Sequence, residues 1–143
     1  MILVDANLLI YAGIENQANH RAASAWLQAQ IQLGHRIGMP WPCLLAFLRI
    51  ATNSRVYASP ATVEEAYSIL ESWLKLPMVW IPSPTARHEE ILGEVLRQSK
   101  AQGNLIYDAH LAALAIEHGL ELCSADSDFA RFEGLRWRNP LLS

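Results

Sequence analysis

The chain has 143 residues, of which 52% are hydrophobic and 17% charged, and its formal net charge is −3 at pH 7. This length and composition predict a single globular domain over residues 1–143 and exclude an intrinsically disordered chain. No apolar stretch approaches the roughly 20 residues that a membrane span needs. The N-terminus lacks the basic start of a signal peptide, so we expect a cytoplasmic protein.

Charge is distributed unevenly along the chain. The net value of −3 is not that of a typical nucleic-acid binder, but most of the acids lie in residues 61–143. The basic side chains of residues 1–60, set against only Asp5 and Glu15, are Arg21, Arg36, Arg49 and Arg55. These arginines allow a local basic surface, and net charge alone does not decide the partner.

The first twelve residues combine a strand pattern with a helix pattern. The run 2–4 is entirely apolar, which predicts a short strand buried on both faces. Asn7 is then expected to be the N-cap of a helix that contains residues 8–11. Asp5 therefore lies at the C-terminal end of a first parallel strand, at the sheet edge where ligands bind in open α/β folds.

Strand-like and helix-like segments alternate along the rest of the chain. Thr62 and Glu65 form a capping-box pattern at the start of one helix, and Gly103 and Gly119 are expected to end two others. The expected helices are 20–33, 42–52, 62–76, 87–102 and 105–118, and the further strands are 36–40, 78–81, 120–123 and 135–137. This order predicts a three-layer α/β/α sandwich around a mainly parallel sheet.

Several carboxylates follow strand ends or begin helices. Asp5 follows the first strand, Asp126 and Asp128 follow the fourth, and Asp108 lies near the start of the helix that Asn104 precedes. Because strand C-termini and helix N-termini share one edge of a parallel sheet, these side chains can converge. Convergent carboxylates repel one another and favour hard cations such as Mg²⁺ or Mn²⁺. For each aspartate alone, a helix-capping role is the competing interpretation.

Four stretches of the chain resemble the PIN-domain ribonucleases, and specifically the VapC-type toxins of toxin–antitoxin pairs. They are residues 2–11 (ILVDANLLIY), 47–53 (FLRIATN), 103–113 (GNLIYDAHLAA) and 124–132 (SADSDFARF). The resemblance spans the chain from end to end in the family's order. It implies an endoribonuclease that uses Mg²⁺ or Mn²⁺, an RNA substrate, inhibition by a small VapB-like antitoxin and, usually, a homodimer.

The resemblance also assigns roles to individual residues. Asp5, Asp108 and Asp126 match the metal-binding aspartates, and Asp128 matches the acid that follows. Ser124 stands where the family has a hydroxyl near the metal. Asn7 matches a small polar residue beside the first aspartate, and both residues are expected to support the site.

One position departs from the family pattern. The family has a glutamate on the helix predicted over 42–52, but that register falls on Phe47, and residues 40–60 contain no acid. A metal ligand is therefore missing or comes from elsewhere, for example from Asp128. The polar residues of this helix and its end are Arg49, Thr52 and Asn53, which are candidates for contact with RNA phosphate or with antitoxin carboxylates. The competing interpretation is that Arg49 pairs with an acid and Asn53 caps the helix.

Other candidate sites are weaker. Cys43 and Cys123 form no C-x-x-C pair and are expected to be buried apolar thiols. The histidines show no zinc spacing, and His110 is assigned a structural role. The basic residues near the C-terminus, for which a solvent-exposed face is favoured over phosphate contact, are Arg131, Arg136 and Arg138.

Two other functions compete with the nuclease. A haloacid-dehalogenase-type phosphatase would use Asp5 as a covalent nucleophile. That family needs an aspartate two residues later, where this chain has Asn7. A catalytically weak or inactive PIN-like module that binds RNA or protein is the second alternative, and the missing glutamate favours it.

Overall fold

A computed structural model describes residues 1–15 and 18–142 of the chain. Its centre is one five-stranded sheet with the order β3-β2-β1-β4-β5, in which every pair of neighbours is parallel. The strands are β1 (Ile2–Val4), β2 (Ile37–Gly38), β3 (Val79–Trp80), β4 (Glu121–Cys123) and β5 (Trp137–Arg138). The predicted parallel sheet is therefore confirmed.

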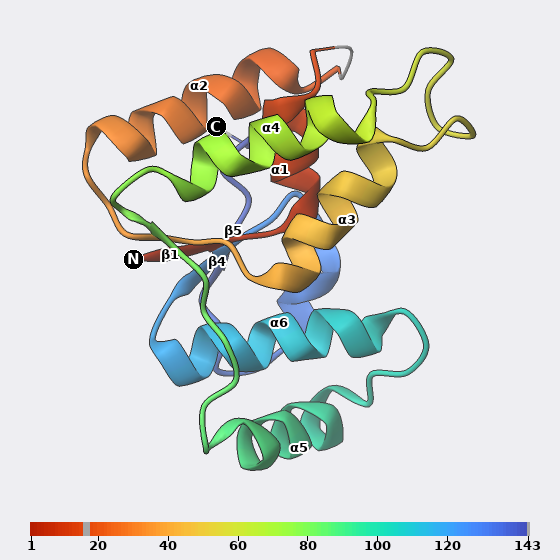
Figure 1. Cartoon of the computed structure of the whole chain (residues 1–143). Coiled ribbons are helices and arrows are strands. Elements are labelled where there is room, and N and C mark those ends of the chain that lie inside the picture. Colours follow the sequence, from red (N-terminus) through yellow and green to blue (C-terminus); the bar gives the residue numbers. More distant parts are fainter. Residues whose placement is uncertain (16–17, 143) are drawn as a thin grey trace.

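Helices cover both faces of this sheet (Figure 1). One layer contains α1 (Ala6–Gly13), α2 (His20–Gln32), α3 (Trp41–Ala51) and α4 (Val63–Leu74). The other contains α5 (His88–Ser99) and α6 (Leu105–His118), and a short 3₁₀ helix, η1 (Ser127–Arg131), follows β4. The three-layer α/β/α arrangement matches the sequence prediction. No helix in the described part of the chain is long and apolar enough to cross a membrane.

The central strand explains why the first residues are so apolar. Ile2, Leu3 and Val4 are at most 4% exposed, because β1 lies between β2 and β4 and has helices on both faces. A strand in that position has no solvent side, so it shows an apolar run in place of alternation. Its C-terminal end carries Asp5 directly to the edge of the sheet.

Several predicted element ends differ from the structure. Asp5, and not Asn7, is the N-cap of α1, because its Oδ1 accepts a hydrogen bond from the Ala6 amide at 2.7 Å. Helix α5 ends at Ser99, and its C-cap Lys100 adopts the left-handed conformation (φ 56°), so the expected end at Gly103 is wrong. The last strand is Trp137–Arg138 and not 135–137. The polar residues of the run 15–19 also predict a loop, and this run falls partly outside the described residues.

Phe47 belongs to the core between α1, α3 and α4. Its side chain is fully buried and its ring contacts Trp73 edge-to-face, with ring centroids 5.0 Å apart. A Cβ on Gly13 would lie 2.8 Å from the Phe47 ring, so α1 approaches α3 closely only because this residue is glycine. The side chain at the position where a family glutamate is expected therefore packs in the interior.

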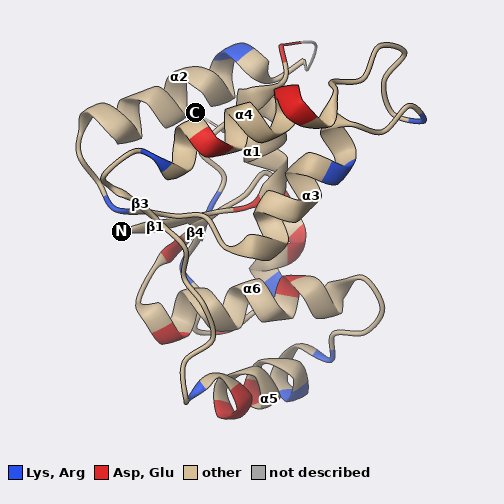
Figure 2. Cartoon of the chain, viewed as in Figure 1, with Lys and Arg blue, Asp and Glu red and all other residues tan. Residues whose placement is uncertain are grey.

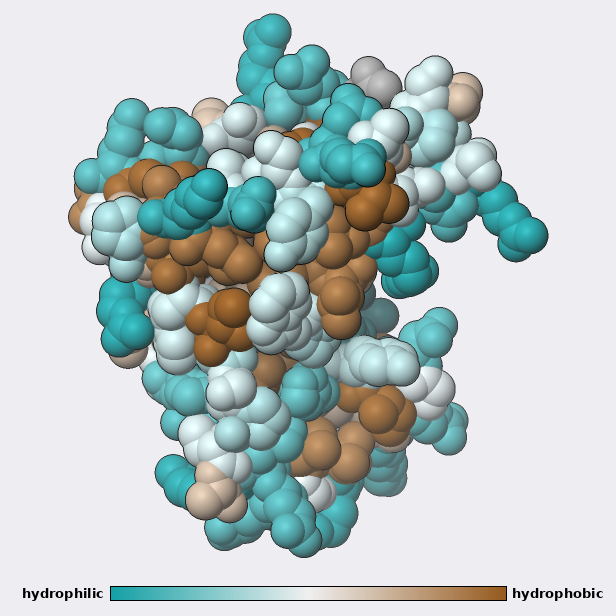
Figure 3. Space-filling model, viewed as in Figure 1, coloured by the Kyte–Doolittle hydropathy of each residue, from teal (hydrophilic) through white to brown (hydrophobic). Residues whose placement is uncertain are grey.

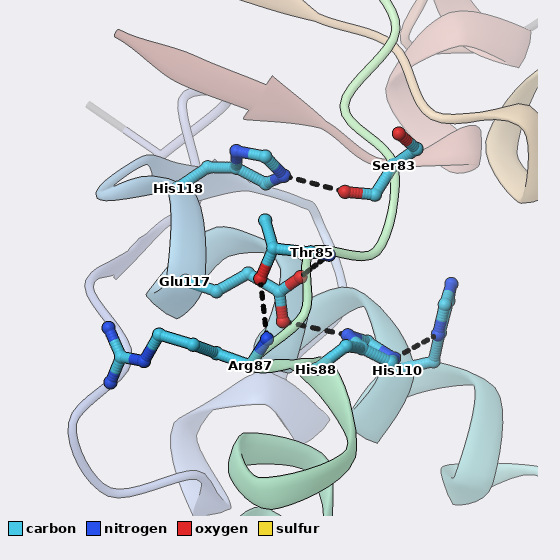
Figure 4. A network of polar contacts seen from close by, with 7 residues as sticks. All are labelled: Ser83, Thr85, Arg87, His88, His110, Glu117 and His118. Atoms are coloured by element: carbon cyan, nitrogen blue, oxygen red, sulfur yellow. Dashed lines mark hydrogen bonds and ion pairs between the residues drawn. The ribbon is translucent and has the colours of Figure 1, made fainter.

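A polar network joins the segment before α5 to helix α6 (Figure 4). The Glu117 side chain is completely buried and accepts hydrogen bonds from the Thr85 amide at 2.8 Å and from His88 Nδ1 at 2.7 Å. His88 Nε2 lies 3.1 Å from His110 Nδ1, so with neutral rings His110 donates to His88. His118 Nε2 donates to the Ser83 carbonyl at 2.7 Å. These contacts agree with the structural role predicted for His110.

Candidate functional site

Carboxylates from three segments meet at the C-terminal edge of the sheet. Carboxylate oxygens of Asp108, Asp126 and Asp128 all lie within 4.8 Å of one another. Asp5 lies close enough that its charge raises the pKa of Asp108. Figure 2 shows these acidic segments gathered between α3 and α6. The sheet topology thus brings together the four aspartates that the sequence scatters over more than 120 residues.

Asp5 is held in one orientation by donors on both of its oxygens. Oδ1 accepts from the Ala6 amide, and Oδ2 accepts from Ser124 Oγ at 2.7 Å. Burial raises the pKa of the Asp5 carboxyl, and the charge of Asp126 adds to this, whereas the hydrogen bonds from Ser124 and Ala6 act against it. Asp5 is therefore a helix cap that also lies beside the carboxylate cluster.

Ser124 and Asn7 connect the ends of β1 and β4. The Ser124 hydroxyl donates to Asp5 and accepts from the Asp126 amide at 3.0 Å and from Asn7 Nδ2 at 3.1 Å. Asn7 Oδ1 accepts from the Ala125 amide at 3.3 Å. One fully buried hydroxyl thereby sets the distance between Asp5 and the backbone that carries Asp126.

Asp126 and Asp128 lie on the turn that begins η1. Asp126 Oδ1 accepts from the Asp128 amide at 2.9 Å, so Asp126 is the N-cap of this short helix. Capping uses one oxygen and leaves the other available to the cluster. The capping and metal-binding interpretations are therefore compatible for this residue. Asp128 is the exposed member of the group.

Asp108 shows the electrostatic cost of this arrangement. Its pKa is raised to about 6 by burial and by the charges of Asp5, Asp126 and Asp128, whereas Arg131 lowers it. Like charges this close favour protonation or a bound cation. The donors are all carboxylate oxygens, a set that fits Mg²⁺ or Mn²⁺ better than zinc.

A cleft of about 820 Å³ opens beside Asp5 and Asp108. Figure 3 shows the surface hollowed between α3 and the start of α6. On the α3 side the cleft is lined by Cys43, Ala46 and Arg49 and not by Phe47. The helix turns facing the carboxylates thus carry no acid, which leaves Asp5, Asp108, Asp126 and Asp128 as the carboxylates of the site.

Cys43, on α3, contacts Asp5 directly. Its Sγ donates weakly to Asp5 Oδ1 over 3.9 Å, and burial raises the pKa of its thiol well above the ordinary value. A thiol that stays protonated is a poor metal ligand. The expectation that both cysteines are buried and free is confirmed for Cys43 and Cys123. The place of Cys43 at the site was not predicted, because an isolated cysteine in an apolar helix carries no distinguishing signal.

The three polar residues of α3 and its end have different positions. Thr52 Oγ1 donates to the Leu48 carbonyl at 2.8 Å, and Asn53 Oδ1 accepts from the Arg55 amide at 2.8 Å. Both side chains are thus used locally at the helix end. Arg49 is exposed and lines the cleft. Of this predicted contact set, it is the residue that lines the same cleft as Asp5 and Asp108.

The three arginines near the C-terminus also separate. Arg136 donates to the Gly119 carbonyl at 2.8 Å, and Arg138 Nε lies 3.2 Å from Glu121. These two side chains therefore hold the chain end against α6 and β4. Arg131 is the last residue of η1, the short helix that Asp126 caps, and its charge lowers the pKa of Asp108.

Comparison with known proteins identifies the family. The sequence profile of the PIN domain matches residues 2–135. The chain belongs to the PIN-domain family. It is similar to Ribonuclease VapC37 of Mycobacterium tuberculosis (strain ATCC 25618 / H37Rv), with 41% identity over 98% of this chain and 97% of the relative. Ribonuclease VapC33 of the same strain is also 41% identical, over 99% of both chains.

Solved structures of PIN proteins share this fold. The crystal structure of VapBC2 from Rickettsia felis, bound to a DNA fragment from its promoter, superposes with a TM-score of 0.71 at 20% identity, over 97% of this chain and 98% of the matched chain. FitAcB from Neisseria gonorrhoeae superposes with a TM-score of 0.68, also at 20% identity, over the whole of both chains. The match to the PIN domain favours a PIN-type site over the dehalogenase-type phosphatase.

Proposed function

We propose that this PIN-domain protein is a VapC-type endoribonuclease that cleaves RNA phosphodiesters with Mg²⁺ or Mn²⁺. The observation that carries the proposal is the group of carboxylates from Asp108, Asp126 and Asp128 beside the half-buried Asp5. Full-length similarity at 41% identity to proteins named Ribonuclease VapC supports it. As in that family, a small VapB-like antitoxin would neutralise the protein, which would act in the cytoplasm as a homodimer.

Asp5, Asp108 and Asp126 would hold the metal, with Asp128 as an outer carboxylate. A bound Mg²⁺ or Mn²⁺ would neutralise these acids and stabilise the charge that develops on the phosphate during cleavage. Ser124 and Asn7 orient Asp5 through the hydrogen bonds described above. Arg49, on the other side of the cleft, is a cation that can bind the phosphate backbone of the substrate.

The lack of an acid on α3 supports a second candidate, a PIN-like module that binds RNA or protein with little or no cleavage. Cys43 and Ala46 line the cleft where a carboxylate from this helix could reach the site, so the ligand set is reduced. Titration calorimetry with Mn²⁺ measures how many ions the remaining carboxylates hold. Tight RNA binding without cleavage or metal binding would favour the module.

The proposal is tested by mapping RNA ends after incubation with Mg²⁺ or Mn²⁺. Asp5→Asn keeps the size of the side chain but removes its charge, and should lower the cleavage rate at least about 100-fold. Glu89→Gln, on the exposed side of α5, is the matched control and should cleave like the unmodified protein. Equal cleavage by the Asp5→Asn variant would show that the carboxylate cluster is not the active site.

A further inference from the structure

Tyr107 is a large aromatic residue that packing does not explain. It lies in the first turn of α6, directly before Asp108, and its side chain is 74% exposed. It lines the same cleft as Asp5 and Asp108. An exposed ring beside a carboxylate cluster offers a flat apolar surface to whatever enters the cleft.

Arg49 completes this surface from the opposite helix. It lies on α3, lines the same cleft and is exposed to solvent. No carboxylate in the part of the chain that the structure describes lies within ion-pair distance of its guanidinium. Its charge is therefore available to an anion that enters from outside.

The chemistry of the cleft matches an unpaired nucleotide. The aromatic ring fits the face of a base, the free guanidinium fits a phosphate, and the carboxylates would reach a second phosphate through a cation. A cleft of about 820 Å³ has room for one or two unstacked nucleotides. An acidic peptide segment would satisfy Arg49 but would be repelled by the aspartates.

We propose that Tyr107 positions the substrate by stacking against an unpaired base next to the cleaved phosphodiester, while Arg49 binds a neighbouring phosphate. This inference rests on the proposed nuclease function and adds the residues that select the substrate's conformation. Both residues are positioning residues, because neither belongs to the carboxylate cluster.

The test compares steady-state cleavage of a short single-stranded oligoribonucleotide by the intact protein and its variants. Tyr107→Ala should raise KM roughly 10- to 100-fold and change kcat little, because stacking energy is lost without altering the carboxylates. Tyr107→Phe should retain the normal KM, since stacking needs the ring and not the hydroxyl. Tyr67→Ala is the matched control, because Tyr67 is 45% exposed on α4 and does not line the cleft.

A binding measurement separates stacking from other contacts. Fluorescence anisotropy in an Asp5→Asn background would follow a labelled oligonucleotide in which abasic sites replace one base at a time. In the protein that keeps Tyr107, an abasic site at one position should weaken binding of the oligonucleotide. In the Tyr107→Ala protein, the same abasic site should not weaken binding further. Arg49→Gln should flatten the dependence of log affinity on log salt by about 0.7. Arg97→Gln, on α5 and outside the cleft, should leave that slope unchanged.

The two proposals fail in different ways. If the intact protein cleaves RNA but Tyr107→Ala keeps the normal KM, or Tyr107→Phe is as impaired as Tyr107→Ala, stacking is wrong and the nuclease proposal stands. An Asp5→Asn variant that still binds RNA in a Tyr107-dependent way supports the stacking role independently of cleavage. Absence of both RNA binding and cleavage by the intact protein would overturn both proposals.

Discussion

The buried Glu117 and the carboxylates at the sheet edge have opposite electrostatic surroundings. Glu117, between α5 and α6, is completely buried and receives one donor from the Thr85 backbone and one from His88. At the sheet edge, Asp108 and Asp126 face further carboxylates, and the pKa of Asp108 is raised to about 6. A carboxylate thus has hydrogen-bond donors around it in one place and other carboxylates around it in the other.

This difference separates a structural role from a functional one. A buried acid that has its own donors and no like charge beside it adds order to the interface and does not need a cation. Acids that face one another reduce the stability of the metal-free protein, and a bound cation removes this repulsion. The sheet edge therefore has the electrostatics of a metal site, whereas the α5–α6 network has those of a packing contact.

The largest expected effect is on catalysis, and it should distinguish the two groups. Asp126→Asn should lower the rate of RNA cleavage at least about 100-fold, because it removes a proposed metal ligand. Loss of a residue that only hydrogen-bonds to a metal ligand costs about 10- to 100-fold. Glu117→Gln should leave cleavage within about twofold, since its network does not touch the cleft. Comparable losses in both variants, measured with the same oligonucleotide, would remove the distinction.

The second effect concerns stability. His88→Leu should lower the free energy of unfolding by about 1–3 kcal/mol, because the buried Glu117 carboxylate loses a donor. Urea denaturation measures this change, with Glu89→Gln as the control on the same helix. A His88→Leu protein as stable as the unmodified one would show that Glu117 does not depend on this contact.

The smallest effect is a pH dependence confined to the metal-free protein. The folded pKa of Asp108 is about 6 against an ordinary value of 3.8, so the folded state binds more protons than the unfolded state between these values. Stability contributed by this group is present at low pH and is lost as pH rises towards 6. In EDTA, Asp108→Asn should therefore be more stable than the unmodified protein at pH 7, and this advantage should shrink towards pH 4.

Thermal unfolding across that pH range, with and without Mg²⁺, measures this difference. Added Mg²⁺ should stabilise the unmodified protein and have less effect on Asp108→Asn, because the ion replaces the proton as the compensating charge. An advantage for Asp108→Asn that stays constant from pH 4 to pH 7 would contradict the proposed origin of the shift.

Much of the fold was predictable because its signals are local. The apolar run of β1 and the capping box of α4 depend on neighbours within a few residues, and both appear as expected. Asp108 and Asp126 were identified because each lies next to a recognisable strand end or helix start. Local signals failed at Asn7, where two plausible caps lie two residues apart and the nearer contact decides between them.

The details of the site depended on contacts between distant segments. Ser124 donates a hydrogen bond to Asp5, 119 residues away in sequence, and accepts one from Asn7, 117 residues away. Cys43 and not Phe47 faces the cleft, because α3 turns its largest ring towards Trp73 in the core. No spacing rule within α3 specifies which of its apolar faces meets α1 and α4.

The sequence by itself determined that this protein has a parallel α/β sheet with aspartates at its C-terminal edge, because strand periodicity and helix capping act over a few residues. Tertiary structure alone decided that Tyr107 and Arg49 share a cleft with Asp5 and Asp108. It also decided that Glu117 is matched by His88 while Asp108 is left among like charges. Which side chains face each other across two helices depends on how the helices pack on the sheet, and that packing is a property of the whole chain.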